Sequence, residues 1–489
     1  MNTSIIRFIL GHVLRIEGML FLLPALTGII YREDEALAYI LMAAITFLLG
    51  FAMTIKKPKD TVFYLKEGCV TTALSWIIMS LFGCIPFMLT GEIPDFVDAY
   101  FEMVSGFTTT GASILKDVEA VSHASLMWRS FSHWIGGMGV LVFLLAIIPL
   151  TGGSNINLMR AESPGPSVGK LVPRMKSSAR ILYLIYVGLT VIELILLLVG
   201  KMNVFDSLCI TFGTAGTGGF GIKNSSAGDY TAYQQWVIAI FMMLFGVNFN
   251  FYYFIIHKKY KKAHEIEEVW WYLGFIIISS IVIFTQIVGS VGAIEPASRQ
   301  AFFQVSSIIT TTGYSTVDFN TWNTLSKAVL VTLMFIGACA GSTGGGMKVS
   351  RIVILSKTFL KEAGSYLHPR SVKKIKMDGE LIDHDVIRST NVYLVAYTMI
   401  FVLSFLIVSY DGKDLVTSFA AVAATYNNIG PGLGLVGPAE NYSVLSSLSK
   451  IVLTFDMLFG RLELFPMIML FHPGIWKETI LSKTRCRKR

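Results

Sequence analysis

The sequence predicts an all-α integral membrane protein, on the strength of its low charge, its long apolar runs and a fourfold internal repeat. Hydrophobic residues make up 53% of the 489 residues and charged residues 15%, whereas soluble domains carry about a quarter charged residues. Apolar runs lie at 37–51, 140–150, 181–199, 237–256, 273–288 and 392–408. With their uncharged flanks, many approach the roughly 20 residues that a helix needs to cross a bilayer.

The chain opens with a pair of apolar segments, at about 5–30 and 36–55. The first has the position of a signal peptide, but Arg15 and Glu17 interrupt its apolar stretch. No small-residue cleavage site follows Leu26. We therefore predict a retained pair of membrane helices.

Four later segments share a glycine-centred pattern and recur about every hundred residues. They read FTTTGAS at 107–113, TAGTGGFG at 214–221, ITTTGYS at 309–315 and YNNIGPG at 426–432. The alignment centres on Gly111, Gly218, Gly313 and Gly430. Such a repeat predicts four copies of one structural unit.

The flanks of the four segments repeat as well. A hydrophobic helix precedes each segment, at 69–89, 181–199, 273–288 and 392–410, and a short amphipathic stretch follows that helix. Three of these stretches begin near Asp98, Asp206 and Asp414. After each segment comes a second apolar helix with small residues midway. The unit is therefore helix, half-helix, loop, helix, and four units plus the N-terminal pair give about ten spanning helices.

This reading divides the chain into five parts: a two-helix extension at 1–60, repeat 1 at 61–155, repeat 2 at 156–262, repeat 3 with an intramembrane gate loop at 263–365, and repeat 4 with a preceding cytoplasmic hairpin and a basic C-terminus at 366–489.

The net charge of +8 is concentrated in alternate connections. Basic residues gather at 56–59, 160–180, 258–262, 348–388 and at the RCRKR end. Cytoplasmic loops of membrane proteins carry such an excess, so we predict cytoplasmic N- and C-termini and four loops that enter from the external face. Nucleic-acid binding would need basic residues interleaved with stacking aromatics on one surface, so none is expected.

Glycine loops at membrane depth predict an ion pathway. Non-helical backbone inside a bilayer must be buried in protein or line water. Main-chain carbonyls replace the hydration shell of a monovalent cation, and glycine permits the φ angles that aim successive carbonyls one way. The half-helix before each loop adds partial negative charge at its C-terminus. The TTGYS sequence at 311–315 is similar to the TVGYG filter of K⁺ channels.

The chain resembles the Trk/Ktr/HKT superfamily of K⁺ transport proteins. The resemblance lies in the four loops, in FSHWIGGMGV at 131–140, in GACAGSTGGGMKVSR at 337–351 and in Arg461 within LFGRLELF. The extra N-terminal pair is typical of the bacterial Trk-type pore subunits. The resemblance implies K⁺ uptake across a bacterial inner membrane, a pseudo-fourfold pore in one chain, a homodimer and a cytosolic nucleotide-binding regulatory subunit of NAD or ATP type.

Three sets of residues are the predicted ion site. The selectivity filter comprises Thr109, Thr110, Gly111, Ala112, Thr217, Gly218, Gly219, Thr311, Thr312, Gly313, Tyr314, Asn428, Ile429 and Gly430. The resemblance implies a gate formed by Gly341, Ser342, Thr343, Gly344, Gly345, Gly346 and Lys348. It also implies that Arg461 is a positive barrier in the pore.

Several alternatives remain open. The loops are unequal, because repeat 2 reads GTGGF and Pro431 in repeat 4 has no N–H, so a poorly selective K⁺/Na⁺ pathway is one alternative. Another is an H⁺- or Na⁺-coupled K⁺ symporter that uses Glu102 or Glu463. Arg461 has Asp456 and Glu463 as candidate ion-pair partners, and residues 341–346 have an alternative role as a small-residue packing patch.

The remaining motifs point to no enzyme and to no cofactor other than the transported K⁺. The chain has no HExxH and no GxSxG motif. The GxGxxG match at 432–437 trails a pore loop rather than a strand. The cysteines, Cys69, Cys84, Cys209, Cys339 and Cys486, show no CxxC spacing. A DG turn within 368–383, flanked by alternating apolar residues, predicts a short hairpin. The stretch either docks a soluble partner or is a solvated basic linker.

Overall fold

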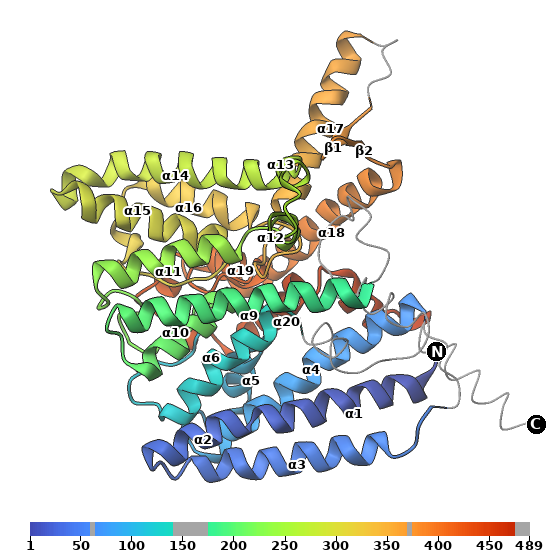
Figure 1. Cartoon of the computed structure of the whole chain (residues 1–489), viewed down its shortest axis with the longest axis vertical. Coiled ribbons are helices and arrows are strands. Elements are labelled where there is room, and N and C mark those ends of the chain that lie inside the picture. Colours follow the sequence, from blue (N-terminus) through green and yellow to red (C-terminus); the bar gives the residue numbers. More distant parts are fainter. Residues whose placement is uncertain (59–63, 140–174, 369–373, 475–489) are drawn as a thin grey trace, which may run out of the picture.

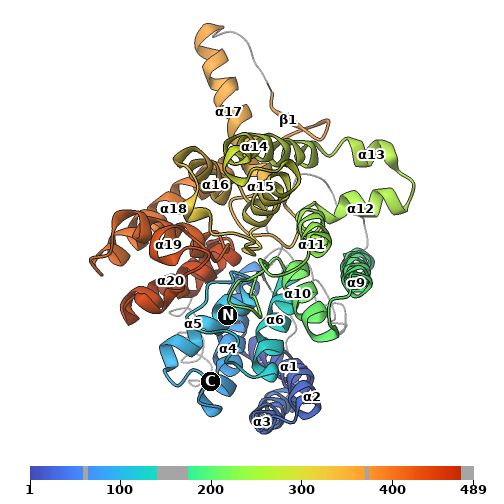
Figure 2. The ribbon, with the colours of Figure 1, turned by 90° about the vertical axis from the view of Figure 1, so that its left-hand side faces the viewer.

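The computed structural model describes residues 1–58, 64–139, 175–368 and 374–474. The basic linker expected at about 151–180 lies outside the described residues up to 174, and its last six residues belong to a helix instead. The end of the chain after 474 also lies outside the described residues. In the described part, the long helices α1, α3, α9 and α14 run in roughly the same direction across Figure 1. Figure 2 looks along them and shows four groups of helices around a common centre, with α1, α2 and α3 outside the first group. This arrangement matches the predicted all-α membrane fold.

The first member of the N-terminal pair comprises α1 (Thr3–Leu20) and α2 (Leu22–Tyr31), which together form one apolar span, and the second is α3 (Ala36–Thr54). Small residues let α1 and α3 approach closely, since a β-carbon at Gly18 would lie 2.8 Å from the main-chain nitrogen of Phe47. Arg15 in α1 lies over the rings of Phe47 and Phe51, at 5.5 and 5.8 Å from their centroids. The prediction of a helix pair at 5–30 and 36–55 is confirmed.

The remaining elements follow the order of the four predicted repeats, although the helices at 260–264 and 349–367 cross the predicted boundaries at 262/263 and 365/366. Repeat 1 contains α4 (Leu65–Leu89), α5 (Phe96–Phe107) and α6 (His123–Gly137). Repeat 2 contains α9 (Met175–Val199), α10 (Val204–Gly216), α11 (Ala232–Phe245), α12 (Phe249–Ile256) and α13 (Tyr260–His264). Repeat 3 contains α14 (Glu267–Val291), α15 (Ile294–Ile309), η1 (Phe319–Thr321), α16 (Thr324–Ile336) and α17 (Val349–Leu367). Repeat 4 contains α18 (His384–Ser409), α19 (Leu415–Tyr426), η2 (Gly434–Val436), η3 (Tyr442–Val444), α20 (Ser447–Arg461) and α21 (Phe465–Phe471).

The second helix of each repeat is a half-helix, which is too short to cross a bilayer. These half-helices are α5, α10, α15 and α19, and they are 12 to 16 residues long. Polar caps start three of them: the side chains of Asp95, Asn203 and Asp414 accept hydrogen bonds from main-chain N–H groups in the first turn. Each half-helix ends where a glycine loop begins. The C-terminal ends of all four helices are therefore directed at the loops.

Six helices in the described residues are long and apolar enough to cross a membrane, and a seventh span results if α11 and α12 count as one. The helices that follow the loops are shorter or interrupted. A 91° bend separates α11 from α12, and residues 337–348 separate α16 from α17. The expected count of about ten spans thus includes short and broken helices.

The predicted hairpin is confirmed. Strands β1 (Lys376–Met377) and β2 (Glu380–Leu381) pair antiparallel. Asp378 and Gly379 connect them with φ angles of 54° and 79°, as a type I′ turn requires. The hairpin and α13 lie toward the same end of the molecule as the N-terminus, and α17 projects beyond the helical body there (Figure 1).

Candidate ion filter and the segment beneath it

The four loops share one main-chain conformation. The second residue before each central glycine has a positive φ: 56° at Thr109, 55° at Thr217, 59° at Thr311 and 55° at Asn428. The N–H of each of these residues donates to the carbonyl three positions earlier, at 3.0 or 3.1 Å. The next residue donates to the carbonyl five positions earlier, at 2.8 or 2.9 Å. Positive φ is uncommon outside glycine, so its recurrence shows that the loops are copies of one structure.

The predicted alignment on Gly218 is wrong by one residue. The N–H of Gly218 donates to the carbonyl of Gly213 at 2.8 Å, the bond that Thr110 makes in repeat 1. The glycine with positive φ is Gly219, at 76°, the counterpart of Gly111, at 77°. Two adjacent glycines make the sequence alignment ambiguous, and only the backbone conformation distinguishes them.

The loops form a closed ring. A β-carbon on Gly111 would overlap the carbonyl oxygen of Gly218 in the next repeat. In the same way Gly219 lies against the carbonyl of Thr312, Gly313 against that of Ile429, and Gly430 against that of Thr110. The same four glycines line one pocket of about 150 Å³ at the mouth of the ring. The predicted filter residues are therefore brought together at one place.

A buried ion pair braces the first two loops. Glu102 in α5 and Arg129 in α6 are 0% and 2% exposed, and their charged groups lie 2.8 Å apart. Glu102 also accepts a hydrogen bond, at 2.9 Å, from the N–H of Ile114, a residue that follows the first loop. Arg129 donates to the carbonyl of Gly221 at 3.2 Å and lies 4.0 Å from the centroid of the Phe220 ring. The pair thus joins the outer ends of loops 1 and 2.

His133 is a second brace, one turn further along α6. Its Nδ1 lies 2.7 Å from the carbonyl oxygen of Gly106, and its Nε2 accepts from the N–H of Phe220 at 3.2 Å. A β-carbon at Gly218 would overlap its ring. One buried imidazole thus links the last turn of α5 to the second loop.

Other side chains attach loops 3 and 4 to their neighbours. Tyr314 is 0% exposed, and its hydroxyl donates to the carbonyl of Ile210 at 3.3 Å. Asn428 donates to the hydroxyl of Thr110 at 2.9 Å. The hydroxyl of Tyr442 donates to the carbonyl of Gly430 at 2.6 Å. Tyr442 follows the loop by twelve residues, and no sequence signal marked it.

Small residues in the helices that follow the loops let them approach the half-helices. A β-carbon at Gly136 in α6 would overlap the carbonyl of Phe107, the last residue of α5. A β-carbon at Gly460 in α20 would overlap the carbonyl of Tyr426, the last residue of α19. The small residues expected midway in these helices thus allow close packing where each half-helix meets its loop.

The glycine-rich segment at 341–346 lies directly against loops 3 and 4. The N–H of Gly345 donates to the hydroxyl of Thr311 at 2.5 Å. A β-carbon at Gly345 would lie 2.7 Å from the carbonyl oxygen of Asn427. Lys348 is 3% exposed and has a φ of 77°, and its ammonium group donates to the carbonyl of Gly344. The segment is held between the broken helices and the ring.

Arg461 joins this segment to the first repeat. Its guanidinium group donates to the carbonyl of Thr343 at 2.9 Å and to those of Gly136 and Gly137 at 2.5 and 2.9 Å. Of the two candidate ion-pair partners, Asp456 accepts from Ser404 at 2.6 Å, and Glu463 pairs with Arg351. Arg461 therefore places a positive charge among carbonyls at the inner side of the ring.

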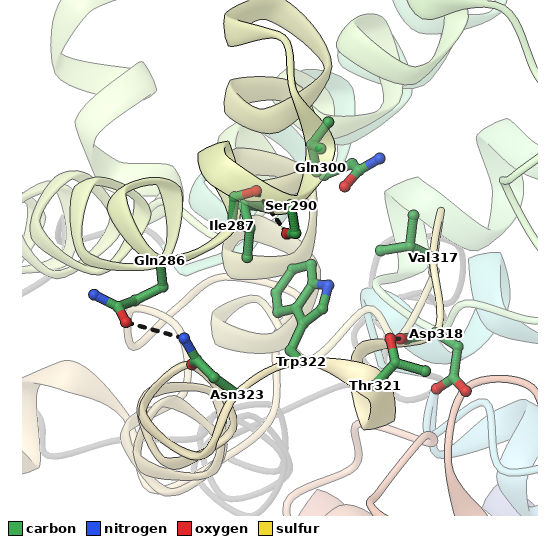
Figure 3. A pocket seen from close by; sticks show the side chains of 10 residues that line it. Gln286, Ile287, Ser290, Gln300, Val317, Asp318, Thr321, Trp322 and Asn323 are labelled. Atoms are coloured by element: carbon green, nitrogen blue, oxygen red, sulfur yellow. Dashed lines mark hydrogen bonds between the residues drawn. The ribbon is translucent and has the colours of Figure 1, made fainter.

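A larger pocket of about 500 Å³ lies away from the ring, beside the C-terminal end of α14 (Figure 3). Trp322 projects into it, and the amide of Asn323 donates to Gln286 at 2.9 Å across its edge. None of its lining residues belongs to the predicted filter or gate. This pocket is separate from the candidate ion site.

A ring of four equivalent carbonyls, enclosed by apolar helices, defines an ion-transporting membrane protein as the class. Residues 33–477 match the family described as TrkH, cation transport protein. The chain belongs to this family, as the sequence resemblance predicted, and it is a multi-pass membrane transport protein rather than an enzyme.

Known relatives are similar over nearly the whole chain. The Trk system potassium uptake protein TrkH of Escherichia coli (strain K12) is 34% identical over 95% of this chain and 99% of its own length. The Trk system potassium uptake protein TrkG of the same strain is 31% identical over 98% and 100%. The crystal structure of the potassium transporter TrkH from Vibrio parahaemolyticus superimposes with a TM-score of 0.87 at 30% identity, covering 97% of this chain and 100% of that one.

Proposed function

We propose that this protein takes up K⁺ across a bacterial inner membrane through a gated, channel-like filter, with both termini in the cytoplasm. The observation that carries the proposal is the closed ring in which the glycine of each loop lies against a carbonyl of the next. Such carbonyls replace the hydration shell of a dehydrated cation. The C-terminal ends of four half-helices add partial negative charge at the same place. The four repeats of the predicted division each supply one quarter of this pore.

The proposed filter residues are those of the four loops from the positive-φ residue to the glycine. Glycine occupies the central position of all four loops, at 111, 219, 313 and 430, which favours a uniform K⁺ site. Relatives named as potassium uptake proteins support the same ion. Ala112 and Tyr314 follow the central glycine and belong to the outer edge of the site.

The segment at 341–346, with Lys348, is the proposed gate, and Arg461 is the proposed barrier. The segment contacts the inner side of loops 3 and 4, where a dehydrated ion would leave the filter. The guanidinium of Arg461 reaches across to the carbonyl of Gly136 in repeat 1. A positive charge here raises the energy of a cation below the filter, and removal of the segment and of this charge opens the path.

The contacts of the two candidate coupling carboxylates do not favour a symporter. Glu102 is engaged by Arg129, and Glu463 by Arg351. Each carboxylate thus already has an arginine partner rather than facing the proposed filter alone.

We extend the proposal to a homodimer regulated by a cytosolic nucleotide-binding subunit, as the sequence resemblance implies. The supporting surface is the projecting helix α17. Its residues Phe359, Leu360, Tyr366 and Leu367 are 66% to 88% exposed, and such apolar patches mark interaction sites. Light scattering on the purified protein tests the dimer, and co-purification with the nucleotide-binding subunit tests the second partner.

Ion flux through the purified protein in liposomes tests the main proposal. Reversal potentials measured in K⁺, Rb⁺ and Na⁺ gradients are expected to follow the K⁺ gradient and to stay unchanged when a pH gradient is imposed. A reversal potential that shifts with the proton or Na⁺ gradient at fixed K⁺ would establish coupling instead. Equal permeability to K⁺ and Na⁺ would establish the poorly selective pathway.

A further inference from the structure

One carboxylate holds both ends of the glycine-rich segment. Glu268, the second residue of α14, is 3% exposed. Its Oε1 accepts hydrogen bonds from the main-chain N–H groups of Ala340, at 2.6 Å, and Ser350, at 2.9 Å. These two residues flank the segment at 341–346. A single oxygen atom therefore sets the distance between the points where the segment begins and ends.

The same carboxylate reaches the broken helix of the neighbouring repeat. Its Oε2 lies 3.4 Å from the amide nitrogen of Asn248, which donates to it. Asn248 lies at the 91° bend between α11 and α12. Ser350 is in the first turn of α17, where main-chain N–H groups lack partners within the helix and carry partial positive charge. A carboxylate is well suited to satisfy them, because charge-assisted hydrogen bonds are stronger than neutral ones.

The hairpin is attached to the residue next to Glu268. The N–H of Glu267 donates to the side chain of Asp378, in the hairpin turn, at 2.9 Å. Lys357 on α17 bonds to the carboxylate of Glu267 at 2.5 Å and to the carbonyl of Lys376 in β1 at 2.8 Å. The hairpin thus holds the first turn of α14, and that turn holds the segment.

We propose that Glu268 is a positioning residue that holds the segment beneath the filter in its closed arrangement, and that the hairpin keeps Glu268 in place through Glu267. This inference rests on the proposed gating by residues 341–346. Displacement of the hairpin shifts the start of α14 and withdraws the carboxylate from Ala340 and Ser350. Both ends of the segment are then free to separate, so a cytosolic event reaches the pore through a few hydrogen bonds.

Flux through the purified protein without any partner tests the clamp. Glu268→Ala and Asp378→Ala are expected to raise K⁺ flux about tenfold, within the usual range of coupling between sites. Glu268→Gln is expected to be intermediate, because the amide oxygen still accepts from both N–H groups but carries no charge. Glu265→Ala, at an exposed position three residues earlier, is the matched control and is expected to leave flux unchanged.

A rise in flux distinguishes positioning from folding, because a misfolded protein loses flux. The K⁺/Na⁺ ratio is expected to stay at the wild-type value in all these variants, since the hydrogen bonds of Glu268 go to Ala340, Ser350 and Asn248, which lie outside the filter loops. The double variant Glu268→Ala/Asp378→Ala is expected to match Glu268→Ala alone. Additive effects of the two substitutions would overturn the link through the hairpin.

Cys339 provides a readout that does not depend on flux. It is 0% exposed and immediately precedes Ala340. In a background with the other four cysteines replaced by serine, a methanethiosulfonate reagent is expected to label Cys339 about tenfold faster in Glu268→Ala. Unchanged labelling and unchanged flux would overturn the clamp.

Deletion of residues 342–345 separates this inference from the gating proposal. If the deletion raises flux while Glu268→Ala and Asp378→Ala do not, the segment gates the pore and the clamp is refuted. If the deletion leaves flux unchanged, the gating proposal fails, and the labelling of Cys339 still decides whether Glu268 holds the segment.

Discussion

Replacing Arg129 by methionine should weaken both the fold and the ion selectivity. The substitution removes a buried charge and leaves the carboxylate of Glu102, 0% exposed, without its cation at 2.8 Å. Breaking one side of a buried pair costs about 3–5 kcal/mol. The contact between Arg129 and the ring of Phe220 is lost too, and a desolvated cation–π contact contributes about 2 kcal/mol.

These magnitudes decide the expected effect on selectivity. A tenfold preference between two ions corresponds to about 1.4 kcal/mol. The support that Arg129 gives to the ends of loops 1 and 2 exceeds that value, so its removal should allow the loops to relax around a smaller ion. We expect Arg129→Met to lower the free energy of unfolding in detergent and to reduce the K⁺/Na⁺ permeability ratio measured in liposomes.

Two further variants make the reasoning refutable. In Arg129→Met/Glu102→Gln neither charge remains, so much of the stability should return, whereas the permeability ratio should stay low because the bond to the carbonyl of Gly221 is still absent. Arg388→Met removes an exposed pair with Asp385, 79% and 87% exposed, and should change neither quantity. Wild-type stability together with a wild-type permeability ratio in Arg129→Met would refute the bracing role.

Three other substitutions have defined outcomes. Gly313→Ser should lower the K⁺/Na⁺ ratio, because a side chain at φ +88° is strained by about 1–3 kcal/mol. The control is Gly91→Ser, at φ +77°, where no atom lies within 4 Å of an added β-carbon. This control should leave the ratio unchanged. Arg461→Gln should raise K⁺ flux by about tenfold for each 1.4 kcal/mol removed from the barrier, and an unchanged flux would contradict the barrier role. Tyr442→Phe should reduce stability by about 1–3 kcal/mol, because the carbonyl of Gly430 loses its 2.6 Å hydrogen bond; equal unfolding curves for the two proteins would contradict this.

Much of the architecture is predictable from the sequence because it follows from local composition. A bilayer excludes unsatisfied backbone and charge, so apolar runs identify the helices. Clusters of basic residues distinguish the connections predicted to be cytoplasmic from those predicted to be external. The repeat of about one hundred residues located all four loops. The DG pair and its flanking apolar residues predicted the hairpin turn, and Asp378 and Gly379 adopt the positive φ that this turn requires.

Only the tertiary structure decided which distant segments contact one another. In repeat 2, only the backbone conformation shows that Gly219, and not Gly218, occupies the central position of the loop. Glu102 was one of two candidate coupling groups in the symporter alternative, and only the fold places Arg129, 27 residues away, against it. Glu268 meets Ala340 across 72 residues. Hydropathy and turn propensity are properties of short windows, whereas a buried charge finds its partner only when packing removes water from both.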